Sequence, residues 1–424
     1  MNDVYAERRS RWTPAPRPDW VRRVNEEGSG IDIKAVVPLD ENALLNAAKT
    51  NAGLEDFGDD SWHEPFARLV KSLDEEAELN LLGRLMTRAE LLILLEARLQ
   101  IEDTIKRYPE ILDEEIKAPF FVVGQGRSGT TFMQNVLAQP PDNGTTMTWE
   151  VMYPCPPPTP DIYWTDPRIA RSNGLTGMLN RVVPELAPMY EYSGDRSTEI
   201  TQLHCLTFVS PNWFPLFAGQ AQSYTDYAHR LDLVPVYEYQ KRVLKLLQWK
   251  NPRRNWVLKS PVAVLHMLHI LKVHPDARFV WMHRDPVKSL SSAVGLAGTL
   301  FWSRSDKPFL GNSMDMFTNA DVSATMLNAP IAWLEQGVMA REQLCNVQFK
   351  DFVRDPVAAV AGIYRYFGAE FTSADEESIR VYLRDNPRSA RPAYHYPEGS
   401  RDQIAKERKA YARYQEYFGV ASEV

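Results

Sequence analysis

The chain has 424 residues, of which 44% are hydrophobic and 24% are charged, and its formal net charge is -7. This composition is typical of a globular protein, and the acidic balance excludes a general affinity for nucleic acid or for anionic membrane surfaces. Cys155, Cys205 and Cys345 are far apart and lack the spacing of a zinc site or a disulfide framework, so we expect a cytoplasmic location. The amino terminus lacks the apolar segment of a signal peptide, and no stretch is long and apolar enough to predict a transmembrane segment.

The first quarter of the chain has a helical pattern. Residues 1–30 are polar and contain several prolines, which predicts a partly ordered arm. Apolar residues then recur at helical spacing over residues 40–50, 61–79 and 81–108, and Ser61 with Glu64 has the spacing of a capping box. We therefore expect residues 1–115 to form an arm and a helical layer that packs on one α/β domain, residues 116–424.

A phosphate loop is predicted directly after the helical layer. Phe120 to Val123 form a short apolar run that suits a buried strand, and Thr130 to Leu137 have a helical pattern. The residues between them are rich in glycine and serine. A strand, a glycine-rich turn and a helix together direct backbone N–H groups and a helix N-terminus at an anion.

The loop departs from the nucleoside triphosphate motif GxxxxGK[ST]. Gly124 and Gly129 have the correct spacing, but Thr130 and Thr131 follow the second glycine, and the expected lysine is missing. The cation of this loop is Arg127, inside it. Hydrolysis of ATP or GTP is therefore disfavoured, and an anion held from within the loop fits better.

The middle of the chain is predicted to be a helical insertion. A turn cluster at residues 140–144 follows the loop helix, and helical periodicity returns over residues 168–183, 197–208 and 234–250. The region shows no strand pattern and is rich in Trp, Tyr and Met. We expect an insertion at about residues 150–250 that covers an active-site cleft.

Further strand and helix pairs complete the predicted sheet. Strands are predicted from Asn255, over residues 278–282 and over residues 345–349, and helices over residues 262–273, 287–300 and 356–367. This alternation predicts an α/β fold with a P-loop-like, mainly parallel sheet flanked by helices. Ligands bind beyond the carboxyl ends of such strands, so the loops at Gly124, Lys259 and Arg284 should converge on one edge.

Three motifs resemble those of the sulfotransferase superfamily, which uses 3′-phosphoadenosine 5′-phosphosulfate (PAPS). They are GQGRSGTTF after the first strand, LKSP after the next, and HRDPVKSLSS after a third. The resemblance covers residues 119–368. It is closest to bacterial, largely actinobacterial, sulfotransferases whose phosphate loop carries an arginine, as in the tyrosylprotein sulfotransferases. It implies PAPS as co-substrate, PAP as product and no metal.

The resemblance assigns roles to individual residues. The loop implied to bind the 5′-phosphosulfate consists of Gly126, Arg127, Ser128, Gly129, Thr130 and Thr131. Arg284 and Ser292 match the pair that binds the 3′-phosphate, and Lys259 matches a lysine that contacts the bridging oxygen of the sulfate. Arg127 and Lys259 would stabilise the negative charge that develops on the leaving phosphate, which makes them catalytic candidates.

The acceptor is expected to be a hydroxyl, and its activation needs a general base. Glu150 is the first candidate, because a glutamate follows the phosphate-loop helix at a similar distance in tyrosylprotein sulfotransferases. Glu199 and His204 are the alternatives. An apolar or aromatic-lined pocket is suggested by large aromatic side chains, which alternatively pack the insertion: Trp149, Tyr153, Trp164, Trp213, Phe214 and Trp302. A small molecule, a lipid or a glycan would fit as acceptor.

Two features of the sequence leave alternatives open. Arg391, His395 and Tyr396 lie in a segment that resembles one that closes near the donor in the bacterial group, or else His395 is structural. A P-loop kinase is one rival function, although Asp285, its possible magnesium ligand, is better explained as a helix cap. An inactive nucleotide-binding relative is the other rival. No pattern indicates an oligomeric state.

Overall fold

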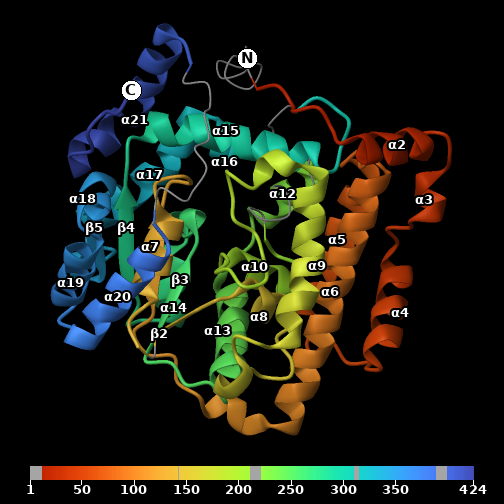
Figure 1. Ribbon diagram of the computed structural model, residues 1–424, viewed down its shortest axis with the longest axis horizontal. Helices are drawn as coiled ribbons and strands as arrows, with labels where there is room; N and C mark the ends of the chain where they lie inside the picture. Colours follow the sequence, from red (N-terminus) through yellow and green to blue (C-terminus); the bar gives the residue numbers. More distant parts are fainter. Residues whose placement is uncertain (1–11, 142, 211–220, 310–314, 388–398) are drawn as a thin grey trace.

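The computed structural model describes residues 12–141, 143–210, 221–309, 315–387 and 399–424. In this part of the chain five strands form one parallel sheet in the order β2-β3-β1-β4-β5 (Figure 1), which confirms the predicted α/β fold. The strands are β1 (Phe120–Gly124), β2 (Asn143–Thr145), β3 (Asn255–Lys259), β4 (Arg278–His283) and β5 (Leu344–Gln348).

The central strand β1 is buried along its whole length, as its unbroken apolar sequence predicts. It pairs with β3 on one side and with β4 on the other, so that Phe121 lies between Leu258 and Phe279. Successive side chains of a strand point to opposite faces of a sheet. Phe121 accordingly packs in one hydrophobic cluster, whereas its neighbour Val122 packs in another.

Helices cover both faces of the sheet (Figure 1). The Phe121 face packs against α13 (Val234–Gln248), α14 (Met267–Val273), α17 (Ala320–Glu335) and α21 (Arg401–Phe418). The Val122 face packs against α7 (Thr130–Leu137), α18 (Phe349–Arg354), α19 (Pro356–Tyr366) and α20 (Ser373–Asp385).

The amino-terminal helices share a hydrophobic cluster with later segments of the chain. The rings of Phe66 and Phe208 meet edge to face with their centroids 4.8 Å apart, and Arg98 donates a hydrogen bond to the carbonyl oxygen of Leu206. These helices therefore pack directly on residues 206–208, in the helical region between the phosphate loop and β3. They are α2 (Asp19–Gly28), α4 (Glu41–Ala52), α5 (His63–Glu75) and α6 (Leu81–Arg107), and the short helix α3 (Ile33–Val36), which adds no residue to this cluster, lies between α2 and α4 in the chain.

Six further helices, of which α9 and α15 are the longest, complete the described part of the chain. They are α8 (Thr148–Met152), α9 (Pro167–Val182), α10 (Thr201–His204), α12 (Gln222–Ala228), α15 (Pro286–Trp302) and α16 (Asp315–Thr318). The 3-10 turns are residues 60–62, 109–113, 160–162, 184–186, 205–207, 261–265 and 341–343. None of the helices in the described part of the chain is long and apolar enough to cross a bilayer.

The structure corrects several local predictions. The turn cluster at residues 140–144 leads into the edge strand β2, where the sequence predicted no strand. Ser61 lies in a 3-10 turn capped by Asp59, and α5 begins two residues later, so the predicted capping box is wrong. The helix predicted over residues 262–273 is divided at His266, and only the last part is α-helical.

Candidate active site

The loops after β1, β3 and β4 meet at one edge of the sheet, as the sequence predicts. Arg284, after β4, donates from Nη1 to the carbonyl oxygen of Arg127 at 3.4 Å. Arg127, in the loop after β1, donates from Nε to Ser292 Oγ of α15 at 3.0 Å. Burial lowers the pKa of Lys259, the last residue of β3, and the nearby positive charge of Arg127 lowers it further. Arg127 therefore connects the three loops.

The shape of the phosphate loop depends on close packing at its two glycines. Gly124 has a φ of 148°, and a Cβ there would lie 2.7 Å from the carbonyl oxygen of Met282 on β4. Gly129, the N-cap of α7, has a φ of 95°, and a Cβ there would lie 2.6 Å from the ring of Phe349. Side chains at either position would displace a neighbouring element.

Two polar residues of the loop have uncommon features, one in its backbone conformation and the other in its hydrogen bonding. Arg127 has a φ of 72°, in the left-handed region, and such a conformation costs about 1–3 kcal/mol in a residue other than glycine. The Ser128 side chain is buried, and its Oγ has no hydrogen-bond partner within the described structure. Both features are common where a loop is shaped to bind a ligand.

A small cavity of about 80 Å³ lies beside the loop. Four of its lining residues were predicted as donor-binding residues, namely Gly126, Arg127, Thr130 and Thr131. Its remaining walls come from the helical segments and from α15, and they include Glu199, Thr201 and Tyr190. The cavity thus combines a phosphate loop with a carboxylate.

Lys259 and Glu199 form an ion pair at this edge of the sheet. Lys259 Nζ is 2.7 Å from Glu199 Oε1, and the lysine is 2% exposed. Burial lowers the pKa of Lys259, and the Glu199 carboxylate opposes that shift. Glu199 lies just before α10, in a segment held to β3 by a hydrogen bond from the Ile200 amide to the Lys259 carbonyl oxygen.

The cations of the loop make contacts inside the protein. Arg127 Nη1 donates to the carbonyl oxygen of Met189 at 2.8 Å. Arg284 forms an ion pair with Glu423, with Nη2 2.9 Å from Oε2, and its guanidinium lies over the Phe349 ring. A ligand anion that binds Arg284 must therefore compete with the carboxylate of Glu423.

Asp285 fixes the segment that carries Glu423. Asp285 Oδ1 accepts from the Val287 amide at the start of α15, which confirms the predicted helix cap. The same carboxylate accepts hydrogen bonds from Arg408 and from the amides of Glu423 and Val424. These contacts lower the pKa of Asp285 against the effect of its burial. Asp285 is thus a structural anchor for the C-terminal segment.

Glu150, the first candidate base, is engaged elsewhere. It is fully buried in α8, where Oε2 accepts from the Met147 amide and Oε1 pairs with Arg253 Nη2 at 2.5 Å. Arg253 lies just before β3, whereas Lys259 is at the opposite end of that strand. Glu150 does not line the cavity at the phosphate loop, and Glu199 does.

The other candidates have structural contacts or lie outside the described residues. His204 is buried, donates a hydrogen bond from Nε2 to Gln240 Oε1, and has its pKa lowered by burial to about 4. It does not line the cavity. Arg391, His395 and Tyr396 lie outside the described residues, as do Trp213 and Phe214.

The aromatic residues expected around the acceptor do not gather at the cavity. Trp149 is buried against Arg168 and Tyr163, Trp302 stacks with Arg17, and Trp164 is 70% exposed. The larger cavity of the helical region is lined chiefly by aliphatic side chains and methionines.

Some residues of the site carry no recognisable sequence signal. Gln125 is buried in the loop, and its Nε2 lies within hydrogen-bond distance of Pro286 O, Ser323 Oγ and Tyr411 OH. Gln125 thereby connects the loop to three helices. The backbone carbonyl of Met189 and the carboxylate of Glu423 come from segments without a motif, so only the fold could identify them.

The architecture is that of an α/β protein of the phosphate-loop kind, with its candidate site at the carboxyl edge of a parallel sheet. The model of the sulfotransferase family matches residues 119–373, and the chain belongs to this family. No curated protein matches it. Among the described residues, no group of three His, Cys, Asp or Glu side chains is placed to hold a metal ion.

Two solved structures have the same fold. Sulfotransferase STF9 from Mycobacterium avium superposes with a TM-score of 0.76 at 24% identity, over 90% of this chain and 97% of that one. Sulfotransferase STF1 from Mycobacterium tuberculosis H37Rv superposes with a TM-score of 0.71 at 24% identity, over 88% of this chain and 98% of that one. The predicted resemblance to actinobacterial sulfotransferases is confirmed.

Proposed function

We propose that the protein transfers a sulfuryl group from PAPS to the hydroxyl of a small-molecule, lipid or glycan acceptor. The observation that carries this proposal is the convergence of Arg127, Lys259 and Glu199 beside the phosphate loop. Two cations and one carboxylate are the groups that such a transfer requires. The family membership of the chain supports the same reaction.

The residues of the candidate site are suited to bind both anionic groups of PAPS, the 5′-phosphosulfate and the 3′-phosphate. The loop from Gly126 to Thr131 precedes the N-terminus of α7, where backbone N–H groups favour an anion. The buried, unpartnered Ser128 Oγ adds a donor that a ligand oxygen would satisfy. Arg284 and Ser292 both contact Arg127, so they are close enough to this loop to bind the 3′-phosphate of the same molecule.

The chemical roles follow from charge. The donor supplies the sulfuryl group, and its departing phosphate keeps the electron pair of the broken S–O bond. Arg127 and Lys259 stabilise this negative charge in a site of low solvent exposure. The oxygen of the acceptor hydroxyl forms the new bond to sulfur, and Glu199 accepts the proton that this hydroxyl loses.

Glu199 suits the role of base better than Glu150. Its side chain is 18% exposed and lines the cavity beside Lys259, so a bound hydroxyl can reach it. Glu150 is wholly buried, and two contacts already use its oxygens. We therefore assign Glu150 the structural role of stabilising Arg253 and the start of α8.

Thermal-shift titration with PAP, with ATP and magnesium, and with adenosine 5′-phosphosulfate tests the donor assignment. A ligand that binds only the folded state raises the melting temperature by mass action. We expect stabilisation by PAP at concentrations where adenosine 5′-phosphosulfate, which lacks the 3′-phosphate, has a much smaller effect. Stabilisation by ATP and magnesium alone would contradict the proposal and favour a kinase.

A further inference from the structure

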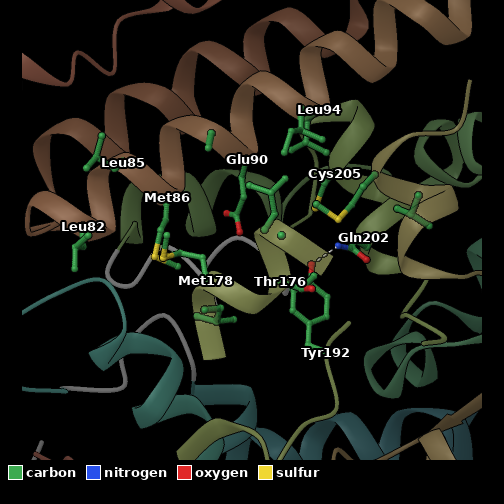
Figure 2. Close-up of a pocket in the computed structure, with 17 residues that line it drawn as sticks. Leu82, Leu85, Met86, Glu90, Leu94, Thr176, Met178, Tyr192, Gln202 and Cys205 are labelled. Atoms are coloured by element: carbon green, nitrogen blue, oxygen red, sulfur yellow. Dashed lines mark hydrogen bonds between the residues drawn. The ribbon is translucent and has the colours of Figure 1, made fainter. Parts of the chain in front are cut away.

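A second cavity, of about 280 Å³, lies between α6, α9 and the segment before and within α10 (Figure 2). Its lining is mainly aliphatic and thioether, with Leu82, Leu85 and Met86 at one end. Tyr192, Gln202 and Cys205 lie toward the other end in the same view. Most of the lining is therefore apolar, with Glu90 and Thr176 partway along the cavity and the other polar side chains toward one end.

The α6 wall of the cavity is an apolar stripe. Leu82, Leu85, Met86, Ala89 and Ile93 follow one another at the spacing of a single helix face, and all of them line the cavity. Leu85 is 46% exposed, so the stripe reaches the surface of the molecule. A concave apolar surface of this kind is typical of a binding site.

Each polar group of the lining already has a partner within the protein. Glu90, the charged residue of the lining, forms an ion pair with Arg304 at 2.7 Å. Gln202 Nε2 donates to the Tyr192 hydroxyl, and Gln202 Oε1 accepts from Thr198. The remaining two, Thr176 and Cys205, bond to carbonyl oxygens one helical turn earlier.

An occupant of this cavity is therefore recognised by its hydrocarbon surface and not by hydrogen bonds or charge. A cavity of about 150 Å³ with an aliphatic lining stays dry and binds a molecule of the size of benzene. The present cavity is almost twice as large, but it is too small for a helix of another protein. A single alkyl or isoprenoid chain matches both its volume and its chemistry.

The polar end of this cavity shares a wall with the cavity at the phosphate loop. Within this wall, Tyr190 lines the loop cavity and Tyr192 the apolar one. The next part of the wall repeats this division, because Thr201 lines the loop cavity and Gln202 the apolar one. A molecule in the apolar cavity thus has one end beside the segment that carries Glu199.

We propose that this cavity binds the hydrocarbon portion of the acceptor, which is an alcohol with an extended apolar chain. The inference rests on the proposed function, since it takes the loop cavity as the place of transfer. The chain lies along the α6 stripe with its far end toward Leu85. The hydroxyl end is directed to the shared wall.

Turnover and binding of primary alcohols from butanol to decanol test the proposal. Each added methylene buried from water should raise kcat/KM with PAPS about fourfold. Gly174→Leu places a side chain in the cavity, because Gly174 lines it and a Cβ there would meet no atom within 4 Å. Gly177→Leu is the matched control on the same helix, also in open space but outside the lining.

We expect Gly174→Leu to weaken decanol binding at least tenfold and to remove the dependence on chain length, with PAP binding unchanged. Gly177→Leu should behave as the unsubstituted protein. Ala89→Leu, on the opposite wall, should reproduce the loss if Gly174→Leu affects folding. Turnover that is independent of chain length would overturn the inference and leave the proposed function intact. Tight decanol binding without turnover of any alcohol would instead overturn the proposed function.

Discussion

The two cavities of the protein are built in different ways. The loop cavity lies beside the phosphate loop, and its lining includes the cation Arg127 and the carboxylate Glu199, which pairs with the buried Lys259 at 2.7 Å. The apolar cavity is formed by the faces of α6 and α9, and its polar groups are paired among themselves (Figure 2). The chemical character of the loop cavity depends on individual charged side chains, whereas that of the apolar cavity depends on the combined surface of many aliphatic side chains.

This difference predicts different sensitivities to substitution. In the loop cavity, replacing a single charged group should change the rate, since each group has its own electrostatic role. In the apolar cavity, a single aliphatic replacement should change affinity by a modest factor, because each side chain adds only its own buried area. The following predictions test this contrast, beginning with the largest effect.

The first prediction concerns Glu199. Glu199→Gln removes the proposed base but keeps the size and the hydrogen-bonding capacity of the side chain, and we expect kcat to fall by roughly 10²–10⁴-fold. Affinity for PAP should change little, which isothermal titration can measure. Unchanged turnover in this variant would show that the loop cavity does not depend on this carboxylate.

The second prediction concerns Lys259. Lys259→Ala removes a cation that acts as charge develops on the leaving phosphate, and we expect kcat to fall by roughly 10²–10³-fold. Because the interaction strengthens in the transition state, the loss should appear in kcat more than in donor affinity. A variant that loses donor binding but keeps kcat would assign Lys259 to ground-state binding only.

The third prediction separates Glu150 from Glu199. Glu150→Gln leaves the buried Arg253 guanidinium without a counter-charge, and breaking a buried pair in this way costs about 3–5 kcal/mol in the free energy of unfolding. Urea denaturation measures this loss. The folded fraction should retain its kcat, and a stable but inactive Glu150→Gln protein would restore Glu150 as the base.

The fourth prediction asks whether both regions lose stability together in acid. Burial lowers the pKa of His204 in the helical region and of His274 and His283 beside the sheet to about 4, from an ordinary 6.5. Between these values the unfolded chain binds more protons than the folded one, so the free energy of unfolding decreases as the pH falls from 6.5 to 4. Each histidine contributes up to about 1.4 kcal/mol per pH unit.

Urea titrations at several pH values within this window, followed by circular dichroism and by tryptophan fluorescence, measure the effect. Coincident transitions at every pH would indicate that the two regions unfold as one unit. A free energy of unfolding that is constant over this window would contradict the prediction.

The smallest expected effect concerns Glu423. Glu423→Gln removes the carboxylate that pairs with Arg284, and PAP affinity should rise about 1.4- to fivefold, in keeping with about 0.2–1 kcal/mol for a partly exposed pair. Glu416→Gln, at an exposed position of α21, changes the net charge equally and serves as the control. If both variants raise PAP affinity equally, the cause is the change in net charge and not the loss of the pair with Arg284.

Much of the fold follows from local sequence patterns. The strands β1 and β4 are nearly continuous apolar runs, and α7 begins and ends at the predicted residues. The missed strand β2 has only three residues, Asn-Gly-Thr, which have the composition of a turn. Its pairing with β3 depends on the tertiary structure, which a local pattern does not contain.

The residues of the candidate site that lie within a sequence motif could be predicted. Arg127, Arg284 and Ser292 come together because parallel strands align their carboxyl ends. The choice between Glu150 and Glu199 could not be made in this way, since it depends on the distant partners Arg253 and Lys259. The apolar stripe of α6 was equally ambiguous, because a core-facing stripe has the same spacing.

The contact between Gly129 and Phe349 has a consequence for biosynthesis. The turn that begins α7 is packed against a residue that the ribosome adds 220 positions later, after the last strand of the sheet. A nascent chain that ends before β5 lacks both this ring and the edge strand itself. We therefore expect fragments that end there to be unable to bind the donor, and the protein to acquire this ability only late in its synthesis.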